Sequence, residues 1–211
     1  MTPKDYAEMR NLFREQLAEA NTCIPAHITD YDAVTRMATV RPAINKRAAD
    51  GRVIAAPEIY NVQVKFPSAK SNGVIISFPI NVGDGGLLHF SQRSIEQWLE
   101  GNHTPEETRT FDLNDAFFVP GVEPWDDLVP AEPDCLLIKI GASALRMYPD
   151  GSGVLTLPAG YTVDSPQTTF TGNVQVDGTI NSDGDTTAAG ISVSEHDHLE
   201  QGDGQPVSKP R

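Results

Sequence analysis

The most concentrated set of potential metal ligands is Glu195-His196-Asp197-His198, near the C-terminal end of the sequence. In an extended strand, residues i and i+2 point to the same face, so His196 and His198 could present two imidazoles about 7 Å apart to one ion. Two neutral nitrogen donors cannot complete a metal shell, so other chains must contribute. Two chains would give a tetrahedral set of four donors suited to zinc. Three chains would give an octahedral set of six, suited to iron(II) or nickel(II).

This metal site depends on how the strand faces. By strict alternation, Ile191 and Val193 lie on one face of such a strand and the two histidines lie on the other. If the apolar residues point inward, a corner or bulge near Ser194 must reverse the facing. An ion held there would clamp the ends of a bundle of chains, where fraying is greatest.

The remaining ionisable residues are scattered, and we interpret them as structural or surface groups. The aspartates could bind a cation or act as catalytic carboxylates, but no partner base or substrate pocket accompanies them. These residues are His27, His89, His103, Asp112, Asp115, Asp126 and Asp127. The glycine-rich run 83–86 lacks the Lys-Ser/Thr of a phosphate loop and is typical of a hairpin turn. We therefore expect no enzymatic activity.

Composition limits the possible partners. The net charge is −13, from 16 basic and 29 acidic residues, which argues against a nucleic-acid groove or adhesion to an anionic membrane. Aromatic residues make up only 7%, so part of the chain is poor in large side chains and needs partners to bury enough apolar surface. Cys23 and Cys135 are expected to be reduced thiols. No signal peptide or membrane span is recognisable, so we expect assembly in a cytoplasm.

The N-terminal part combines a helical pattern with a strand pattern. Residues 3–20 place Tyr6, Met9, Phe13, Leu17 and Ala20 on one helical stripe, which predicts a short amphipathic helix. Such a helix would dock on its own domain, our first expectation, or on a neighbour. From about residue 23 the period becomes two, and five or so short strands broken by Gly and Pro predict a small closed barrel.

The C-terminal part is different in kind. Beyond a proline-rich boundary near residue 130, short strands with few apolar residues are separated by glycine turns. The predicted strands are 135–140, 145–148, 154–157, 161–163, 174–176 and 191–193. A stacked β-solenoid or an intertwined β-helix needs only such a narrow apolar seam, because neighbouring turns or chains cover the rest. The alternative is a disordered polar tail.

Several phrases resemble a known family, the central spike (membrane-puncturing needle) proteins of phage baseplates. Segments 61–67, 79–88, 90–98 and 115–121 resemble the N-terminal oligonucleotide/oligosaccharide-binding (OB) type barrel of these proteins. Segment 190–198, followed by 202–204, resembles their C-terminal apex.

The resemblance implies an all-β fold with an N-terminal helix. Its parts would be the helix (1–21), a small OB-type barrel (22–130), an intertwined trimeric β-helix (131–195), and a pointed metal-bound apex (196–211). It also implies a homotrimer in which His196 and His198 of each chain hold one iron ion, with zinc or nickel as less favoured metals. Residues 199–201 depart from the small residues expected after the histidines.

The function implied is that of a structural, non-enzymatic spike at the tip of a contractile phage tail baseplate in the virion. The barrel would attach to the tail hub, and sheath contraction would drive the spike through the host outer membrane. No nucleic acid is expected as a partner. The alternative is a receptor-binding adhesin or short tail fibre. Trp98 and Trp125 lie in the N-terminal part, whereas an adhesin should present aromatic residues at its C-terminal tip.

Overall fold

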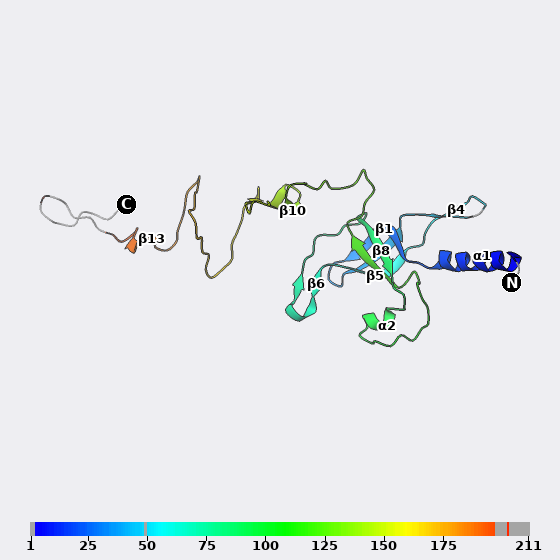
Figure 1. The fold of residues 1–211 in the computed structure, drawn as a ribbon. Helices are drawn as coiled ribbons and strands as arrows, with labels where there is room; N and C mark the ends of the chain where they lie inside the picture. The colour runs from blue at the N-terminus through cyan, green and yellow to red at the C-terminus, as the bar shows by residue number, and fades with distance from the viewer. Residues whose placement is uncertain (1–2, 49, 197–201, 203–211) are drawn as a thin grey trace. The chain divides into compact units, whose positions relative to one another are not determined.

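The computed structural model describes residues 3–48, 50–196 and 202. The chain divides into two compact units, Met1–Pro133 and Asp134–Arg211. The first unit contains helix α1 (Pro3–Glu19) and a closed barrel, and the second contains two small antiparallel sheets. Figure 1 shows the order of these elements along the chain. Among the described residues, no helix is both long enough and apolar enough to cross a membrane.

Helix α1 begins with Pro3, which suits the first helical turn. Its apolar stripe is not buried, because Tyr6, Phe13 and Leu17 are all exposed. The expectation that this helix docks on its own domain is therefore wrong for the isolated chain. The barrel closes its core with its own strands, and the hydrophobic cluster inside it includes no α1 residue.

Five strands close the barrel in the order β1-β2-β5-β9-β8. Strands β5 and β9 are parallel, and the other neighbours are antiparallel. The strands are β1 (Cys23–Asp32), β2 (Met37–Pro42), β5 (Ile59–Val64), β8 (Gly85–Phe90) and β9 (Ala116–Pro120). Register shifts between Ile28 and Asp30 and between Ala38 and Val40 mark irregularities of the bulge type, which help strands to bend around a small barrel. The mostly β fold, the N-terminal helix and the five-stranded barrel are confirmed.

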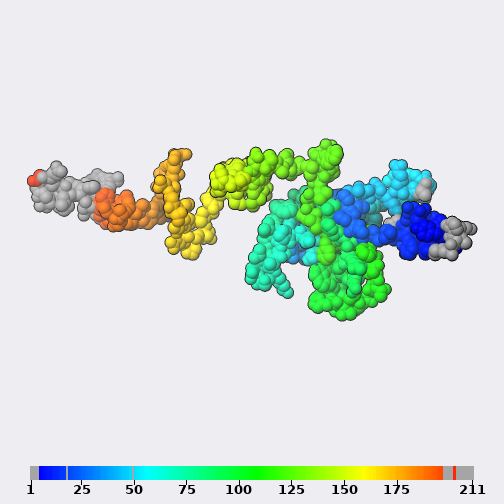
Figure 2. Space-filling model, viewed as in Figure 1, coloured from blue at the N-terminus to red at the C-terminus, as the bar shows by residue number. Residues whose placement is uncertain are grey.

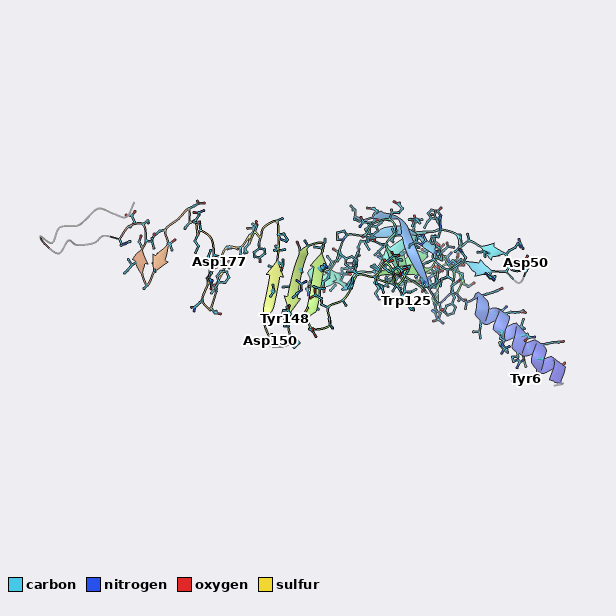
Figure 3. All side chains as sticks on the ribbon, turned by 90° about the horizontal axis from the view of Figure 1, so that it is seen from above. Tyr6, Asp50, Trp125, Tyr148, Asp150 and Asp177 are labelled. Atoms are coloured by element: carbon cyan, nitrogen blue, oxygen red, sulfur yellow. The ribbon has the colours of Figure 1, made fainter. Side chains whose placement is uncertain are left out.

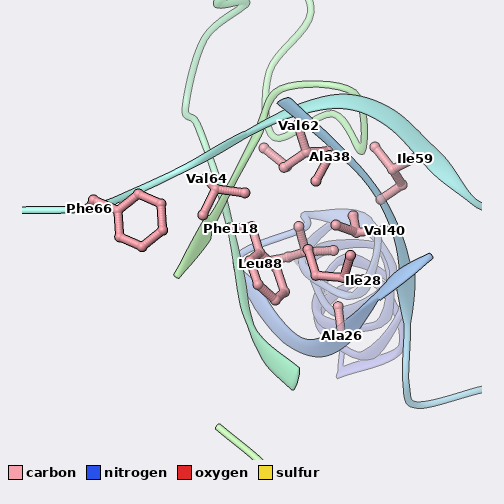
Figure 4. Packing of buried hydrophobic residues seen from close by; sticks show 11 residues of the cluster. Ala26, Ile28, Ala38, Val40, Ile59, Val62, Val64, Phe66, Leu88 and Phe118 are labelled. Carbon is pink, nitrogen blue, oxygen red and sulfur yellow. The ribbon is translucent and has the colours of Figure 1, made fainter. Parts of the chain in front are cut away.

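The barrel core follows the alternation of its strands. Phe118 and Leu88 are paired across β8 and β9 and are completely buried, as is Ile28. A Cβ on Gly86 would lie 2.5 Å from the Phe118 ring, so the glycine makes room for that ring. The whole cluster (Figure 4) comprises Ala26, Ile28, Ala38, Val40, Ile59, Val62, Val64, Phe66, Leu88, Ala116 and Phe118.

The first unit also contains several short elements besides the barrel strands. Two hairpins and two helical turns lie in the connections between the barrel strands. They are β3 (Lys46–Arg47) with β4 (Val53–Ile54), β6 (Ser68–Ala69) with β7 (Val74–Ile75), the 3-10 turn Lys70–Asn72, and α2 (Glu96–Leu99). Trp98 on α2 lies edge-on to Phe117 of β9, with ring centroids 6.1 Å apart.

The second unit consists of two small sheets and long stretches without helix or strand. Strands β10 (Leu136–Ile140), β11 (Ser143–Met147) and β12 (Gly153–Thr156) form one antiparallel sheet (Figure 3). Strands β13 (Thr187–Ala188) and β14 (Ile191–Ser192) form another. Residues 157–186 contain no helix or strand, so the strands expected at 161–163 and 174–176 are not formed in the single chain. In an intertwined β-helix, the backbone groups at the strand edges pair with other chains, and a single chain does not include those partners. The trimeric β-helix therefore stays a prediction.

Candidate functional site

The region before His196 is organised by the β13–β14 hairpin. Thr187 pairs with Ser192, and Ala188 pairs with Ile191. The two turn residues, Ala189 and Gly190, have φ values of 51° and 83°. Positive φ at both central positions is what a type I′ hairpin turn requires, and its twist matches that of the strands. The hairpin therefore gives the C-terminal segment a defined starting direction.

The chain turns directly after β14, at residues 193–195. The Asp185 carboxylate accepts hydrogen bonds from the backbone N–H (3.3 Å) and the hydroxyl (2.8 Å) of Ser194. The Ser192 hydroxyl accepts one from the Glu195 N–H at 2.8 Å. Side-chain hydrogen bonds from Ser194 and Ser192 lower the pKa of Asp185, so the group that holds this turn stays ionised at neutral pH. A corner therefore lies at Ser194, where the predicted metal site needs one.

His196 is half-buried at the end of this turn, and it does not lie in an extended strand. Its Nδ1 is 2.9 Å from the carbonyl oxygen of Ser192 and 3.0 Å from that of Val193. Carbonyl oxygens only accept hydrogen bonds, so Nδ1 carries the hydrogen, and in the neutral ring Nε2 carries the lone pair. Metal-binding histidines commonly use this arrangement, in which a carbonyl fixes the tautomer and the ring orientation. The environment of His196 therefore fits a metal ligand.

The second predicted ligand, His198, lies outside the described residues, as does Asp197. Within residues 3–48, 50–196 and 202, no group of three or more His, Cys, Asp or Glu side chains could hold a metal ion. The pairing of His196 with His198, and their orientation relative to a threefold axis, stay predictions.

Asp115 has a structural role that its sequence context did not reveal. It is fully buried, and its carboxylate accepts hydrogen bonds from Arg109 Nε at 2.8 Å and from the Ile95 N–H at 2.9 Å. Burial would raise the pKa of Asp115, but the hydrogen bonds from Arg109 and Ile95 and the guanidinium charge outweigh it and lower the pKa. The same contact raises the pKa of Arg109. Asp115 therefore holds together the connection between β8 and β9, which contains both partners, and the idea of a catalytic or cation-binding carboxylate here is not supported.

The other scattered candidates lie apart and serve local structure. His27 is in β1, exposed His89 is in β8, and exposed His103 follows α2. Asp112 accepts hydrogen bonds from the backbone and side chain of Asn114 within a turn. Asp126 and Asp127 are exposed in the connection after β9. Gly83, with φ of 101°, forms a turn before β8. The hairpin turn expected over residues 83–86 is wrong, because Gly85 and Gly86 belong to β8, which pairs with β1 and β9 and not with the preceding strand β7.

The barrel can be compared with known families now that its strands are defined. Residues 24–121 match the family described as Phage protein Gp138 N-terminal domain. The barrel region is therefore similar to this family. The match begins one residue after the start of β1 and ends one residue after β9, so it covers the barrel strands and the connections between them. A search of curated proteins found no match.

The matched family is described as a phage protein domain, and residues 24–121 of this chain are similar to it. Helix α1 and the unit from Asp134 onward lie outside the match. For those parts, the exposed apolar side chains are the informative feature. Leu136, Ile138 and Ile140 alternate along one face of β10, and all are exposed. Figure 2 shows this second unit in yellow to orange.

Proposed function

We propose that this chain is the central spike of a contractile phage tail baseplate, acting as a homotrimer that pierces the host cell envelope on sheath contraction. In this function the Gp138-type barrel attaches to the tail hub. The unit from Asp134 onward forms the trimeric β-helix, and the C-terminal histidines hold a metal at the tip. The spike works mechanically and carries out no chemical reaction.

One observation carries the proposal: the second unit buries almost none of its apolar residues. Among its described residues, Ala144 is the only hydrophobic side chain in the buried class. Exposed large apolar residues recur along the rest of it: Leu136, Ile138, Ile140, Met147, Val154, Leu155, Tyr161, Val163, Phe170, Val174, Val176, Ile180, Ile191 and Val193. Burying one such side chain stabilises a fold by about 1.5–3 kcal/mol, which identical copies could supply along a shared axis.

The environment of His196 supports a metal at the tip. Three copies of His196 and His198 would provide six imidazole nitrogens, an octahedral set suited to iron(II), with nickel or zinc less favoured. The hydrogen bonds from Nδ1 to the two carbonyls direct the lone pair of the neutral ring to Nε2. When bound, the ion would crosslink the C-terminal segments of three chains.

The assembly is tested on the purified full-length chain by light scattering coupled to size-exclusion chromatography. We expect the mass of a trimer, and a monomer would reject the proposal. Antibodies against the barrel should also label the baseplate end of intact phage tails in electron micrographs. Labelling at another location would reject the assignment to the baseplate.

The metal is tested by elemental analysis of protein purified without chelators. We expect about one iron per three chains. The double variant His196→Ala/His198→Ala should lose this iron and remain trimeric, because the β-helix seam holds the chains together. His103→Ala, which removes an exposed histidine from the first unit, is the matched control and should keep the iron. Unchanged iron in the double variant would place the metal elsewhere.

A further inference from the structure

Helix α1 carries its apolar residues in a heptad pattern. With Tyr6 assigned to position a of the repeat abcdefg, Phe13 is also at a, and Met9 and Gln16 are at d. Ala20, at the next a position, directly follows the last helical residue. This is the 3-4 spacing with which helices pack along one another in coiled coils. One polar residue, Gln16, interrupts the seam, and such a residue can specify register at a cost in stability.

The positions beside the seam are complementary between copies. Position g is occupied by Asp5, Leu12 and Glu19, and position e by Arg10 and Leu17. In a parallel bundle, position g faces position e of the next heptad in a neighbouring helix, five residues further along. Asp5 therefore faces Arg10 of a second copy, and Leu12 faces Leu17 of a second copy. One contact pairs opposite charges and the other is apolar, so both favour association.

The outer positions show that the pattern is confined to one side. The outer positions b, c and f include the exposed polar residues Glu8, Asn11, Arg14 and Glu15. Their other members are Lys4 and two small residues, Ala7 and Ala18. Apolar residues at a, d, e and g make a wider face than the two-position seam of a simple pair. A wide face of this kind can be covered by two neighbours at once.

The helix gains little stability by itself. Tyr6 is 60% exposed, Phe13 63% and Leu17 74%, so the face contributes no burial within the chain (Figure 3 shows Tyr6 on the helix). An isolated helix of 17 residues is marginal in water. The last turn contains no basic residue to interact with the helix dipole and instead includes Glu19. Association of the apolar faces would supply the missing stability.

The connection between α1 and the barrel is short and anchored. Only Ala20 separates the helix from Asn21, whose side chain donates a hydrogen bond to the Phe111 carbonyl at 2.8 Å. The next residue, Thr22, accepts a hydrogen bond from the Phe90 N–H at 3.1 Å. In a trimer, three such anchored helices would start at equivalent points, and their high effective concentration would favour association of even short helices.

We propose that α1 forms a parallel three-helix bundle with α1 of two further copies of this chain, as a second trimerisation element at the N-terminal end. The proposal rests on the trimer of the proposed function and is independent of the metal. The occupant of the apolar face is thus a second copy, and the a, d, e and g residues are its contact surface.

Disulfide crosslinking tests the bundle in the full-length chain. In a Cys23→Ser/Cys135→Ser background, Tyr6→Cys and Phe13→Cys are each oxidised, and covalent dimers are measured on denaturing gels. Asn11→Cys, at the outer position f, is the matched control. We expect several-fold more dimer at positions 6 and 13 than at position 11. Tyr6 lies near one end of the helix, so its crosslinking also distinguishes a parallel from an antiparallel bundle.

Light scattering on the same samples separates this inference from the proposed function. A monomeric chain would reject both. A trimer in which positions 6 and 13 crosslink no better than position 11 would reject the bundle alone and leave the face for another protein. Crosslinking at 13 without crosslinking at 6 would reject the parallel arrangement.

Charge exchange gives a second test that does not depend on cysteine chemistry. Arg10→Asp places two negative charges opposite each other, and Asp5→Arg places two positive charges there. Either change alone should lower the melting temperature of the helical circular dichroism signal of the trimer, and the combined exchange should restore it. Glu15→Arg, at the outer position c, should have little effect. Failure of the combined exchange to restore the signal would overturn the Asp5–Arg10 pairing.

Discussion

The barrel and the unit beginning at Asp134 use β-strands in opposite ways. The barrel closes its sheet, so every strand has two neighbours and eleven hydrophobic side chains share one buried cluster. The second unit has open sheets of three strands and two strands, and Ala144 is its one hydrophobic residue of the buried class among those described. A sheet without a second layer leaves one apolar face in water.

This difference shows which parts can fold alone. A closed barrel satisfies its own backbone groups and its own core, so its structure needs no partner. In the proposed trimer, the second unit would bury its regularly spaced apolar residues against other chains. Variants that act on one region and not on the other test this comparison. Their expected effects on the free energy of unfolding decrease from Phe118→Ala to Ile138→Asp.

Phe118→Ala should have the largest effect. The ring is completely buried at the centre of the barrel, and its removal leaves a cavity. We expect the barrel to lose about 3–5 kcal/mol of unfolding free energy in urea titrations. Trp125→Ala is the control, because Trp125 is 93% exposed. This change should alter the unfolding free energy of the barrel by less than about 0.5 kcal/mol. Equal effects of the two changes would contradict the barrel core described above.

Asp115→Asn should follow, with a loss of about 3 kcal/mol, because it leaves the Arg109 guanidinium without its buried counter-charge. The pKa of Asp115 is lowered in the fold, so its contribution is present above the ordinary carboxyl pKa of 3.8 and is lost as pH falls through the lowered value. Urea titrations across this acidic range should therefore show a steeper loss for the native chain than for the variant.

The control for this pH dependence is Asp126→Asn, which removes an exposed carboxylate from the connection after β9. This variant should leave the difference in unfolding free energy between neutral and acidic conditions unchanged. If it removed the same pH-dependent component as Asp115→Asn, the buried ion pair would not be its source.

Gly190→Ala should have a smaller and local effect of about 1 kcal/mol. Its φ of 83° is unfavourable for residues with a side chain, although a Cβ would meet no atom within 4 Å. Hydrogen exchange at Ser192 should accelerate about fivefold, as a loss of this size implies. Exchange within the barrel should not change. Gly172→Ala is the control, since its backbone has no positive φ and a Cβ there also meets open space.

Ile138→Asp should have the smallest effect on the unfolding free energy of the barrel, below about 0.5 kcal/mol. Ile138 lies exposed on β10, in the other unit. If β10 contributes to a trimer seam, light scattering should show dissociation. Lys139→Asp, on the opposite face of β10, provides the comparison. A trimer that tolerates Ile138→Asp would remove β10 from the proposed seam.

Much of the barrel could be predicted from residue patterns. Alternation around Val40, Val62 and Leu88 indicated strands that bury one face, and glycines such as Gly83 indicated turns. The role of Asp115 could not be predicted, because its partners Arg109 and Ile95 meet it only when the connection between β8 and β9 folds back on itself. At the candidate metal site, the pattern required a corner near Ser194 but did not identify Asp185 as the residue that holds it.

By itself, the sequence determined the properties that depend on neighbouring residues: the strand period, the turn glycines, and the heptad order of Tyr6, Met9 and Phe13 in α1. Tertiary structure alone decided the parallel pairing of β5 with β9, the burial of Asp115, and the exposure of the α1 stripe. The reason is physical. Local patterns specify which side of an element is apolar, whereas what covers that side depends on contacts between residues distant in the chain.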